Sequence, residues 1–284
     1  MATLCNLCPN DCNVDREIKT GACRALATMK ICRIACHHYE EPIISGIRGS
    51  GTVFFSGCSL DCEFCQNHLI SKSYVGKEYT PNQLAMELKK LEYTGAHNIN
   101  FVTPTHFSDK ICEVLSIYRP NIPIVYNTSG YEKTEVIEKL NDFVDIYLVD
   151  MKYGDNETAK KFSKINNYCQ YNFDAVKLMV DSKEIIIEDG LMKKGVIVRH
   201  LVLPDNLDNT KKVIETFAKN FKDKAIFSVM SQFVPCYKST ITRKLKPIEY
   251  KMVISALEKS GIEDCYIQEL SSAETDYIPE FSLV

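Results

Sequence analysis

The sequence predicts an α/β fold, a partial (β/α)6 TIM-like barrel, and three observations support this prediction. Short apolar runs alternate with helix-like segments from Thr52 onward. The runs are apolar throughout, which is typical of strands buried on both faces. Repeated strand-then-helix units form parallel sheets. Since catalytic loops in such folds follow the carboxyl ends of the strands, we expect the functional residues at that edge.

Six runs are expected to be the strands. In chain order they read TVFF, NINFVT, IPIVYN, DIYLVDM, GVIVRHLVL and AIFSVM, beginning at Thr52, Asn98, Ile122, Asp145, Gly195 and Ala225. Each is short and bounded by polar or turn residues, so six strand-helix units indicate a partial or open barrel.

The clearest helix is TPNQLAMELKKLEYTG. Thr80 is placed as the N-cap, Pro81 at the first helical position, and Gln83 completes a capping box. Gly95 is expected to end the helix. Its apolar face comprises Leu84, Leu88 and Leu91.

Weaker helical patterns occur in SDKICEVLSIY, EKTEVIEKL, NTKKVIETFAKNF and PIEYKMVISALEKSG. In the last, we expect Ile248, Met252 and Val253 to lie on one side, before Gly261. Residues 171–194 interrupt the rhythm with a short helical run and a β-like edge, which turns at Glu188, Asp189 and Gly190. The final DYIPEFSLV is expected to be a tail on the surface of the domain.

Bulk composition is that of an ordinary folded, soluble protein, with 284 residues, 45% hydrophobic and 25% charged. A formal net charge of -3 gives no bulk reason to expect nucleic acid or an anionic membrane as partner. No apolar run approaches the roughly eighteen residues of a membrane span, and MATLCNLCPNDC lacks the features of a signal peptide. We therefore expect a cytoplasmic protein.

Cysteines are concentrated near the N-terminus. Of thirteen, nine lie in the first 65 residues: Cys5, Cys8, Cys12, Cys23, Cys32, Cys36, Cys58, Cys62 and Cys65. Without a secretory signal, metal binding is favoured over disulfides. We expect a cysteine-rich metal-binding extension over residues 1–50 and the barrel with its C-terminal tail over 51–284.

Three of these cysteines form a compact group in SGCSLDCEFCQN, directly after the first strand. Thiolates from Cys58, Cys62 and Cys65 could hold a four-iron cluster and leave one iron without a protein ligand, open to substrate or cofactor. The alternatives are a zinc site with a fourth ligand such as His68 or Cys36, or a plain electron-transfer cluster. Position at a strand end favours the catalytic cluster.

The Cys58-x3-Cys62-x2-Cys65 motif resembles the signature of radical S-adenosylmethionine enzymes, and the resemblance extends from about Thr52 through Gln232. It implies a [4Fe-4S] cluster that splits S-adenosylmethionine reductively into methionine and a 5'-deoxyadenosyl radical, which takes hydrogen from a substrate. It also implies an electron donor such as flavodoxin or ferredoxin. By the same resemblance, Phe64 packs beside the adenine.

Within that superfamily the chain looks most like the pyruvate formate-lyase activating enzyme group, in a branch with an N-terminal cysteine extension. The residues that carry this likeness are Gln66 and Asn67 after the cysteines, and the strands VYNTSGY, DIYLVDMKY and GVIVRHLVLP. The chain departs from the group after its second strand, where FVTPTHF replaces a Gly-Gly-Glu type motif. There Thr103, Thr105 and the carbonyls near Pro104 would receive the methionine amine.

Other strand ends supply polar groups for the same cofactor. Asp150 and Lys152 resemble an Asp-x-Lys motif whose lysine meets the methionine carboxylate, although a strand-end ion pair is the alternative. Asn127 and Ser129, with Gly130, could contact the cofactor, or could simply form a turn.

We expect Arg199 to point inward and hold an anion, and His200 to point to the opposite face of the same strand. His106 and Gln232 lie near strand ends, where they could touch substrate or only be hydrogen-bonded. Cys236 is the one late cysteine that could approach the cluster. The other three, Cys112, Cys169 and Cys265, are expected to be packing residues.

The N-terminal cysteines Cys5, Cys8, Cys12 and Cys23 suffice for one tetrahedral site, which could fold a segment too small for its own core. Zinc or an auxiliary iron-sulfur cluster fits, and we favour a structural metal over an electron relay. Further ligands could come from Cys32, Cys36, His37 and His38, but KICRIACHHYEEP also reads as a strand-like link into the barrel.

The sequence therefore supports two hypotheses. The first is a radical enzyme that abstracts hydrogen from a protein, peptide or small molecule, with activation of a glycyl radical enzyme as the favoured role. The second is a non-catalytic iron or zinc protein in which all the cysteines are structural.

Overall fold

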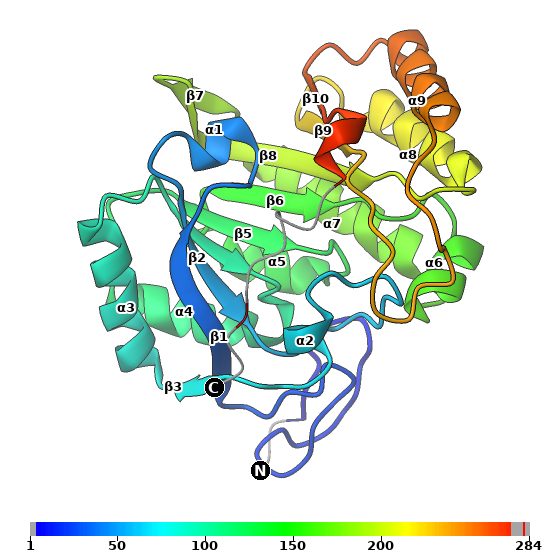
Figure 1. Cartoon of the computed structure of the whole chain (residues 1–284). Helices are drawn as coiled ribbons and strands as arrows, with labels where there is room; N and C mark the ends of the chain where they lie inside the picture. The colour runs from blue at the N-terminus through cyan, green and yellow to red at the C-terminus, as the bar shows by residue number, and fades with distance from the viewer. Residues whose placement is uncertain (1–3, 274–280, 282–284) are drawn as a thin grey trace.

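A computed structural model describes residues 4–273 and residue 281 (Figure 1). Its strands are β1 (Met29–His37), β2 (Ser50–Phe55), β3 (Lys77–Tyr79), β4 (Ile99–Val102), β5 (Ile124–Thr128), β6 (Ile146–Asp150), β7 (Ile186–Glu188), β8 (Leu191–Leu201), β9 (Ile226–Met230) and β10 (Cys265–Ile267). They form a ten-stranded sheet in the order β10-β9-β8-β6-β5-β4-β2-β1-β3, and β7 pairs with β8 outside this path.

The predicted fold class is confirmed. The six expected runs are β2, β4, β5, β6, β8 and β9, which pair with their neighbours in parallel. β10 continues the parallel set beside β9, while β1 and β3 add antiparallel strands at the other edge. The result is an open, mostly parallel sheet of the partial-barrel type.

The helices between these strands are α1 (Pro42–Ser45), α2 (His68–Ser71), α3 (Pro81–Tyr93), α4 (Ser108–Ile117), α5 (Thr134–Leu140), α6 (Asn156–Ser163), α7 (Tyr168–Ser182), α8 (Leu207–Asn220) and α9 (Pro247–Ser260), with 3-10 turns η1 (Thr105–Phe107) and η2 (Leu270–Ser272). None of these described helices combines the length and apolar character needed to cross a membrane.

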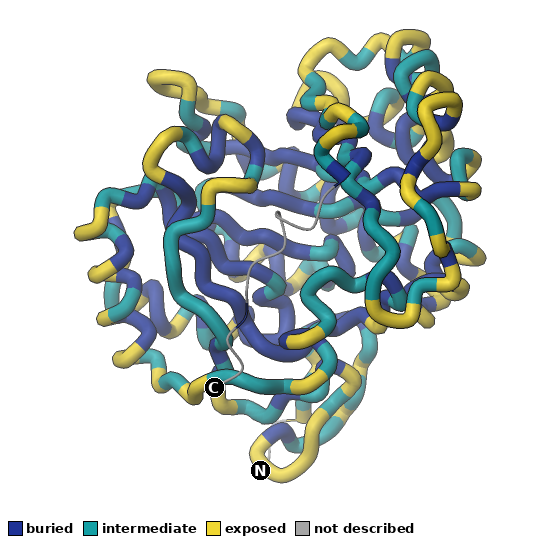
Figure 2. Tube along the Cα trace, viewed as in Figure 1, coloured by how far each residue is buried: buried dark blue, intermediate teal, exposed yellow. Residues whose placement is uncertain are grey.

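Both faces of the sheet are buried, as the uniformly apolar strands predict. Tyr126 and Val198 pack with the helices on one face, in the largest hydrophobic cluster. Val125 and Ile197, one residue earlier in each strand, point to the other face and pack with Ile44 of α1. Figure 2 accordingly shows the central parallel strands mostly buried and β1 of intermediate burial, with exposed residues on the outer helices and turns.

Helix α3 begins as predicted. Thr80 accepts a hydrogen bond from the Gln83 backbone, and the Gln83 side chain accepts one from the Thr80 backbone, so the capping box is complete. The expected apolar face of α9 is wrong in part, because Ile248 and Met252 are 62% and 45% exposed. The buried face of α9 instead runs through Glu249, Val253 and Leu257.

The interruption between β6 and β8 contains the predicted hairpin. Asp189 and Gly190 have positive φ angles of 51° and 76° and turn the chain from β7 into β8. The preceding helix, α7, has 15 residues and is not the short run expected. Most of the C-terminal DYIPEFSLV lies outside the described residues, but Phe281 packs edge-on against Phe54, with ring centroids 5.5 Å apart.

The KICRIACH segment forms β1, so its strand interpretation is confirmed. Because β1 pairs with β2, residues 29–37 belong to the same sheet as the barrel strands. The division of the chain at residue 50 remains a prediction. Residues 4–28 precede β1, and their regular structure consists of one isolated bridge between Leu4 and Asp15.

Candidate functional site

A cavity of about 520 Å³ opens at the carboxyl ends of the parallel strands. Its walls come from the segment after β1, the cysteine loop after β2, and the ends of β4, β5, β6, β8, β9 and β10. Of the residues predicted from the sequence, it is lined by Cys58, Cys62, Phe64, Cys65, Thr103, Asn127, Ser129, Asp150, Lys152, Arg199 and Gln232. The fold thus gathers most of the predicted site in one place.

The cysteine loop begins with a glycine that the fold requires. Gly57 has φ 88°, and a Cβ there would lie 2.5 Å from the Cys23 carbonyl oxygen. The next residue, Cys58, donates its backbone N–H to that same carbonyl at 3.2 Å. The N-terminal cysteine segment therefore contacts the loop directly.

The three loop thiols line the cavity together, with Cys62 buried and Cys58 and Cys65 partly exposed. Burial raises the pKa of Cys58 to about 12, with further increases from Cys62 and Cys65. Each sulfur has a hydrogen-bond donor nearby: the Leu60 N–H is 3.4 Å from Cys58, the Ser163 hydroxyl 2.9 Å from Cys62, and the Ser71 hydroxyl 3.3 Å from Cys65. Three cysteines with such donors suit an iron-sulfur cluster with one position left for another ligand, and this ligand set remains a prediction.

Phe64, between two of these cysteines, is buried and lines the cavity. Its ring lies edge-on to Phe162 and Phe233, with centroids 6.0 and 5.9 Å away. This fixes an apolar ring beside the cysteines, but its contact with adenine remains a prediction.

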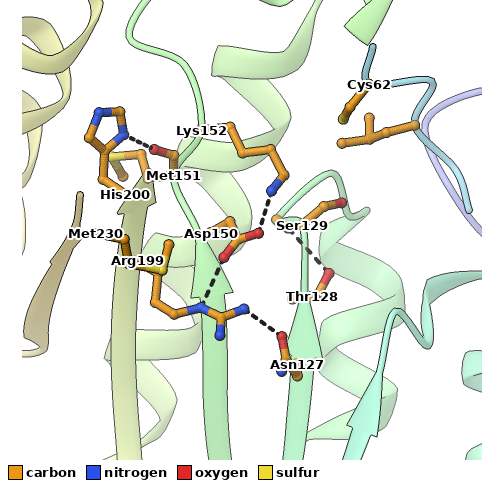
Figure 3. A network of polar contacts seen from close by, with 12 residues as sticks. Cys62, Asn127, Thr128, Ser129, Asp150, Met151, Lys152, Arg199, His200 and Met230 are labelled. Carbon is orange, nitrogen blue, oxygen red and sulfur yellow. Dashed lines mark hydrogen bonds and ion pairs between the residues drawn. The ribbon is translucent and has the colours of Figure 1, made fainter. Parts of the chain in front are cut away.

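Arg199, on β8, is the centre of a buried polar network (Figure 3). Its guanidinium donates to Asp150 Oδ1 at 3.0 Å, to Glu40 Oε2 at 3.0 Å and to Asn127 Oδ1 at 2.6 Å. The expectation that Arg199 points inward is therefore confirmed. His200 faces the other way, where it donates to the Met151 carbonyl at 2.8 Å and lies 3.0 Å from the Thr210 hydroxyl.

Asp150 lies between two cations. Lys152 pairs with Asp150 Oδ2 and Arg199 with Oδ1. Burial alone would raise the pKa of Asp150, but the two cations hold it below its ordinary value. Burial likewise works against the charge of Lys152, and Asp150 outweighs it, so the pKa of Lys152 is raised. Both groups stay charged at the cavity wall.

Two carboxylates in the cavity were not predicted from the sequence: Glu40 and Glu41, which follow β1. Glu40 Oε1 accepts from the side-chain amides of Asn100 and Asn127, each at 3.1 Å. Burial raises the pKa of Glu40, and Arg199 opposes that increase. A signal was present, because two consecutive acids immediately followed a strand-like run.

The end of β4 agrees only in part with expectation. Thr103 lines the cavity and has φ 57°, a conformation that is rare and strained for a β-branched residue. Thr105 does not line it: its hydroxyl donates to the buried Glu132 carboxylate at 2.6 Å. The expectation that Thr105 contacts the cofactor is wrong because the η1 turn carries its side chain away from the cavity. His106 is likewise buried elsewhere and donates to the Ser56 carbonyl at 2.7 Å.

The late cysteines behave largely as expected. Cys112, Cys169 and Cys265 pack against the hydrophobic clusters. Cys236 lies outside the cavity lining, but its thiol donates to the Phe64 carbonyl at 3.3 Å and interacts electrostatically with Cys65. It therefore approaches the cysteine loop without entering the cavity.

The four N-terminal cysteines come together in the segment before β1. The pKa of Cys23 is raised, first by burial and also by Cys5 and Cys12, and Cys8 interacts with Cys23 in the same way. The sulfur of Cys12 accepts the Ala22 N–H at 3.2 Å. All thirteen cysteines are free thiols.

Within residues 4–273 and 281, no group of three or more His, Cys, Asp or Glu side chains is already in metal-ligand spacing, and this includes Cys58, Cys62 and Cys65. Of the other suggested ligands, Cys32, Cys36 and His37 lie in β1, and His37 and His38 line the cavity. A wider and more open hollow of about 1000 Å³ lies elsewhere, between the loop after α1, the loop before β5 and the β7–β8 turn, and contains none of the cysteines.

The sequence model of the radical SAM superfamily matches residues 52–217. The chain therefore belongs to the radical SAM superfamily. Membership in this superfamily implies a [4Fe-4S] cluster and binding of S-adenosylmethionine. The cavity fits these groups, because three cysteines, an aromatic ring and a buried cation line it together.

An uncharacterized protein of Methanocaldococcus jannaschii is 35% identical over 277 residues, which cover 92% of this chain and 76% of that protein. Among solved structures, Streptococcus suis SuiB bound to its precursor peptide SuiA has a TM-score of 0.55 at 11% identity, and the match covers 76% of this chain and 48% of SuiB. The FeFe-hydrogenase maturase HydG of Carboxydothermus hydrogenoformans has a TM-score of 0.52 at 17% identity, covering 80% of this chain and 59% of HydG. These two structures share the fold, and the chain spans about half the length of SuiB.

Proposed function

We propose that this protein cleaves S-adenosylmethionine reductively and abstracts hydrogen from a substrate, with activation of a glycyl radical enzyme as its role. The observation that carries the proposal is that Cys58, Cys62 and Cys65 open into the same cavity as the half-buried Asp150, Lys152 and Arg199. When bound, the cluster and S-adenosylmethionine would supply an electron and the 5'-deoxyadenosyl radical. An external donor such as flavodoxin or ferredoxin would deliver the electron.

The chain's own residues would hold the cofactor at the strand ends. Cys58, Cys62 and Cys65 would ligate the cluster, and Lys152 would bind the methionine carboxylate as a buried cation. Thr103, Asn127 and Ser129 offer polar groups for the amine and ribose, with Thr103 held in place by its backbone N–H, which donates to the Asn127 carbonyl at 2.9 Å. Phe64 would pack against the adenine.

Arg199 has a positioning role in this arrangement. Its three hydrogen bonds are made to protein groups, and one of them orients Asp150, which in turn holds Lys152. A buried charge with its hydrogen bonds satisfied is a rigid support rather than a free anion-binding group.

A second role is modification of another peptide or of a small molecule. It is favoured by the similar fold of SuiB, which is described with a precursor peptide bound. The match covers only about half of SuiB. Peptide binding is therefore a property of SuiB, and a peptide substrate is proposed for this chain only by analogy.

At the N-terminus, we place a structural zinc or iron on Cys5, Cys8, Cys12 and Cys23. Support comes from the mutual interaction of these thiols and from the Ala22 N–H that points at the Cys12 sulfur. A segment with almost no regular structure gains most of its stability from such a metal. Among the described residues, neither these four cysteines nor Cys58, Cys62 and Cys65 are already in metal-ligand spacing.

The test is 5'-deoxyadenosine formation by the anaerobically reconstituted protein with S-adenosylmethionine and dithionite. Product from the native chain and none from Cys58→Ala would support radical chemistry at this loop. No product from the native chain with a full cluster would favour the non-catalytic alternative. A glycine-centred radical signal in a purified glycyl radical enzyme would then separate activation from other modifications.

A further inference from the structure

The side of the cavity formed by β9 and β10 carries hydrogen-bond acceptors that the proposed cofactor site does not use. We call Glu41, Ser228 and Gln268 the acceptor wall. Ser228 on β9 lies opposite Tyr266 on β10 in the parallel register. Gln268 follows Tyr266 by two residues and lies on the same face of the chain. All three members of the wall line the cavity.

Two oxygens of the acceptor wall have no donor. Glu41 is 8% exposed, and within the described part of the chain its Oε2 has no hydrogen-bond partner. The Oε1 of Gln268 has none either, while its amide nitrogen donates to Gln232 at 3.1 Å. A buried oxygen without a donor costs free energy, so both oxygens favour a ligand that donates hydrogen bonds.

The charges of the cavity point to a cation. Its carboxylates are Glu40, Glu41 and Asp150, and the lysine and arginine that line it are Lys152 and Arg199. Lys152 pairs with Asp150, and Arg199 with Asp150 and Glu40. Among the described residues, Glu41 is left without an ion pair. Burial raises the pKa of Glu41, and the charge of Arg199 and a hydrogen bond from Ser228 only partly offset that increase.

Sheet order separates Ser228 and Gln268 from the groups expected to hold S-adenosylmethionine. Glu41 follows β1, but its carboxyl interacts with Ser228 and Tyr266 and so lies on their side of the cavity. The cysteine loop follows β2 and Lys152 follows β6, whereas Ser228 and Gln268 belong to β9 and the end of β10. Arg199, on β8, lies between the two sides. A cofactor that reaches from the cysteine loop to Lys152 leaves the β9–β10 side of the cavity for a second molecule.

We propose that the acceptor wall binds an ammonium or guanidinium group of the substrate. The ligand would donate to Glu41 Oε2 and Gln268 Oε1 and supply the positive charge that Glu41 lacks. This rests on the proposed function, since it assigns the substrate of that reaction to a chemical class. The cation can belong to a small amine or to a basic side chain beside the reacting carbon of a peptide.

Calorimetry on the anaerobically reconstituted protein, saturated with S-adenosylmethionine and without reductant, tests this proposal. The probes are agmatine, the uncharged 1,4-butanediol, which has the same four-carbon chain, and acetyl-glycyl-arginine amide as a peptide. At least one cationic probe should bind ten times more tightly than the diol. Tight binding of agmatine would indicate that the substrate is a small amine. Binding of the peptide alone would indicate that the cation is a basic side chain of a peptide.

Glu41→Gln should weaken that binding at least tenfold and change the affinity for S-adenosylmethionine less than twofold. Glu188→Gln, on the exposed β7, is the matched control and should change neither. If the Glu41→Gln variant loses its cluster, Gln268→Leu tests the same acceptor wall and should weaken binding of the cationic probe several-fold.

Cationic probes that bind no better than the diol would overturn the proposal, as would an equal loss of S-adenosylmethionine affinity in Glu41→Gln, which would assign the wall to the cofactor. Formation of 5'-deoxyadenosine is measured separately. Product without cation binding would reject the acceptor wall alone, and cation binding without product would reject the radical reaction alone.

Discussion

The backbone N–H of Cys58 donates to the carbonyl of Cys23 at 3.2 Å and so joins the two cysteine groups of the protein. Two further contacts lie beside it: the Asn10 amide donates to the Ser59 carbonyl at 2.7 Å, and Arg24 pairs with Asp61 at 3.0 Å. The N-terminal segment thus holds the cysteine loop at three points. Since that segment has little regular structure of its own, whatever orders it also supports the loop.

Loss of the metal proposed for the N-terminal cysteines is therefore expected to loosen the catalytic cluster. Cys12→Ser should release cluster iron to a chelator several-fold faster than the native protein, as followed by the decay of cluster absorbance. Asn10→Ala should have a similar but smaller effect while keeping the N-terminal metal. Cys112→Ser, in a packing position on α4, is the control. Equal release rates in all four proteins would show that the two groups are independent.

Replacement of Lys152 by methionine is expected to weaken S-adenosylmethionine binding about tenfold or more, equivalent to ~1.4 kcal/mol. The reason is that the cavity then lacks the cation proposed for the methionine carboxylate, while Asp150 keeps Arg199 as a partner. The dissociation constant is measured on cluster-loaded protein. Lys164→Met, exposed after α6, is the matched control. An unchanged constant would mean that Lys152 only forms a strand-end ion pair.

Arg199→Met is expected to destabilise the fold by roughly 3–5 kcal/mol, because it leaves Asp150 and Glu40 buried with less compensation. Arg199→Lys should recover only part of the loss, because a single ammonium nitrogen cannot reach the three acceptors that the planar guanidinium contacts through three separate nitrogens. Urea unfolding under anaerobic conditions gives the free energies. Arg119→Met removes a more exposed pair with Asp145 and should cost under about 1 kcal/mol. Similar losses in both would contradict the central place of the Arg199 network.

Glu132 gives a pH dependence with a definite sign. Burial raises its pKa from 4.5 to about 7, against hydrogen bonds from Thr105, Thr128 and Tyr126. The folded protein therefore holds this proton more tightly than the unfolded chain, and the stability it contributes is complete below pH 4.5 and lost as the pH rises to about 7. The shift corresponds to about 3 kcal/mol at most.

Glu132→Gln removes this titration but keeps an oxygen acceptor. As the pH rises from about 4.5 to about 7, the melting temperature of the variant should increase relative to that of the native protein, and the difference should stay constant at higher pH. Glu135→Gln, exposed on α5, should follow the native curve. Parallel curves for native and Glu132→Gln would show that the carboxyl does not titrate in this range.

Local signals were enough for much of the barrel. Six apolar runs became parallel strands because each is an uninterrupted apolar segment and helical segments separate it from the next run. The caps of α3 were equally clear, because Thr80 and Gln83 act on each other within one turn. Three-residue β10 carried no such signal, and its pairing with β9 depends on a partner already in place.

Predictions failed where a residue type that is usually exposed is buried, or the reverse. α9 buries Glu249, not Ile248, because Arg243 holds that carboxylate with two hydrogen bonds, at 2.6 and 2.8 Å. Glu40 and Glu41 were missed for the same reason: acids are rarely buried unless paired, and the partner of Glu40 is Arg199, 159 residues away.

By itself, the sequence determined the succession of strands, the cysteine loop at the end of the first of them, and the chemistry of its three thiolates, because each depends on spacing within a few residues. Only the tertiary structure decided which polar residues share the cavity. It turned Thr103 in and Thr105 away, and brought Glu40 and Glu41 from the antiparallel edge to Arg199. Those choices depend on strand register and on pairing between distant segments, where a shift of one residue reverses the face a side chain presents.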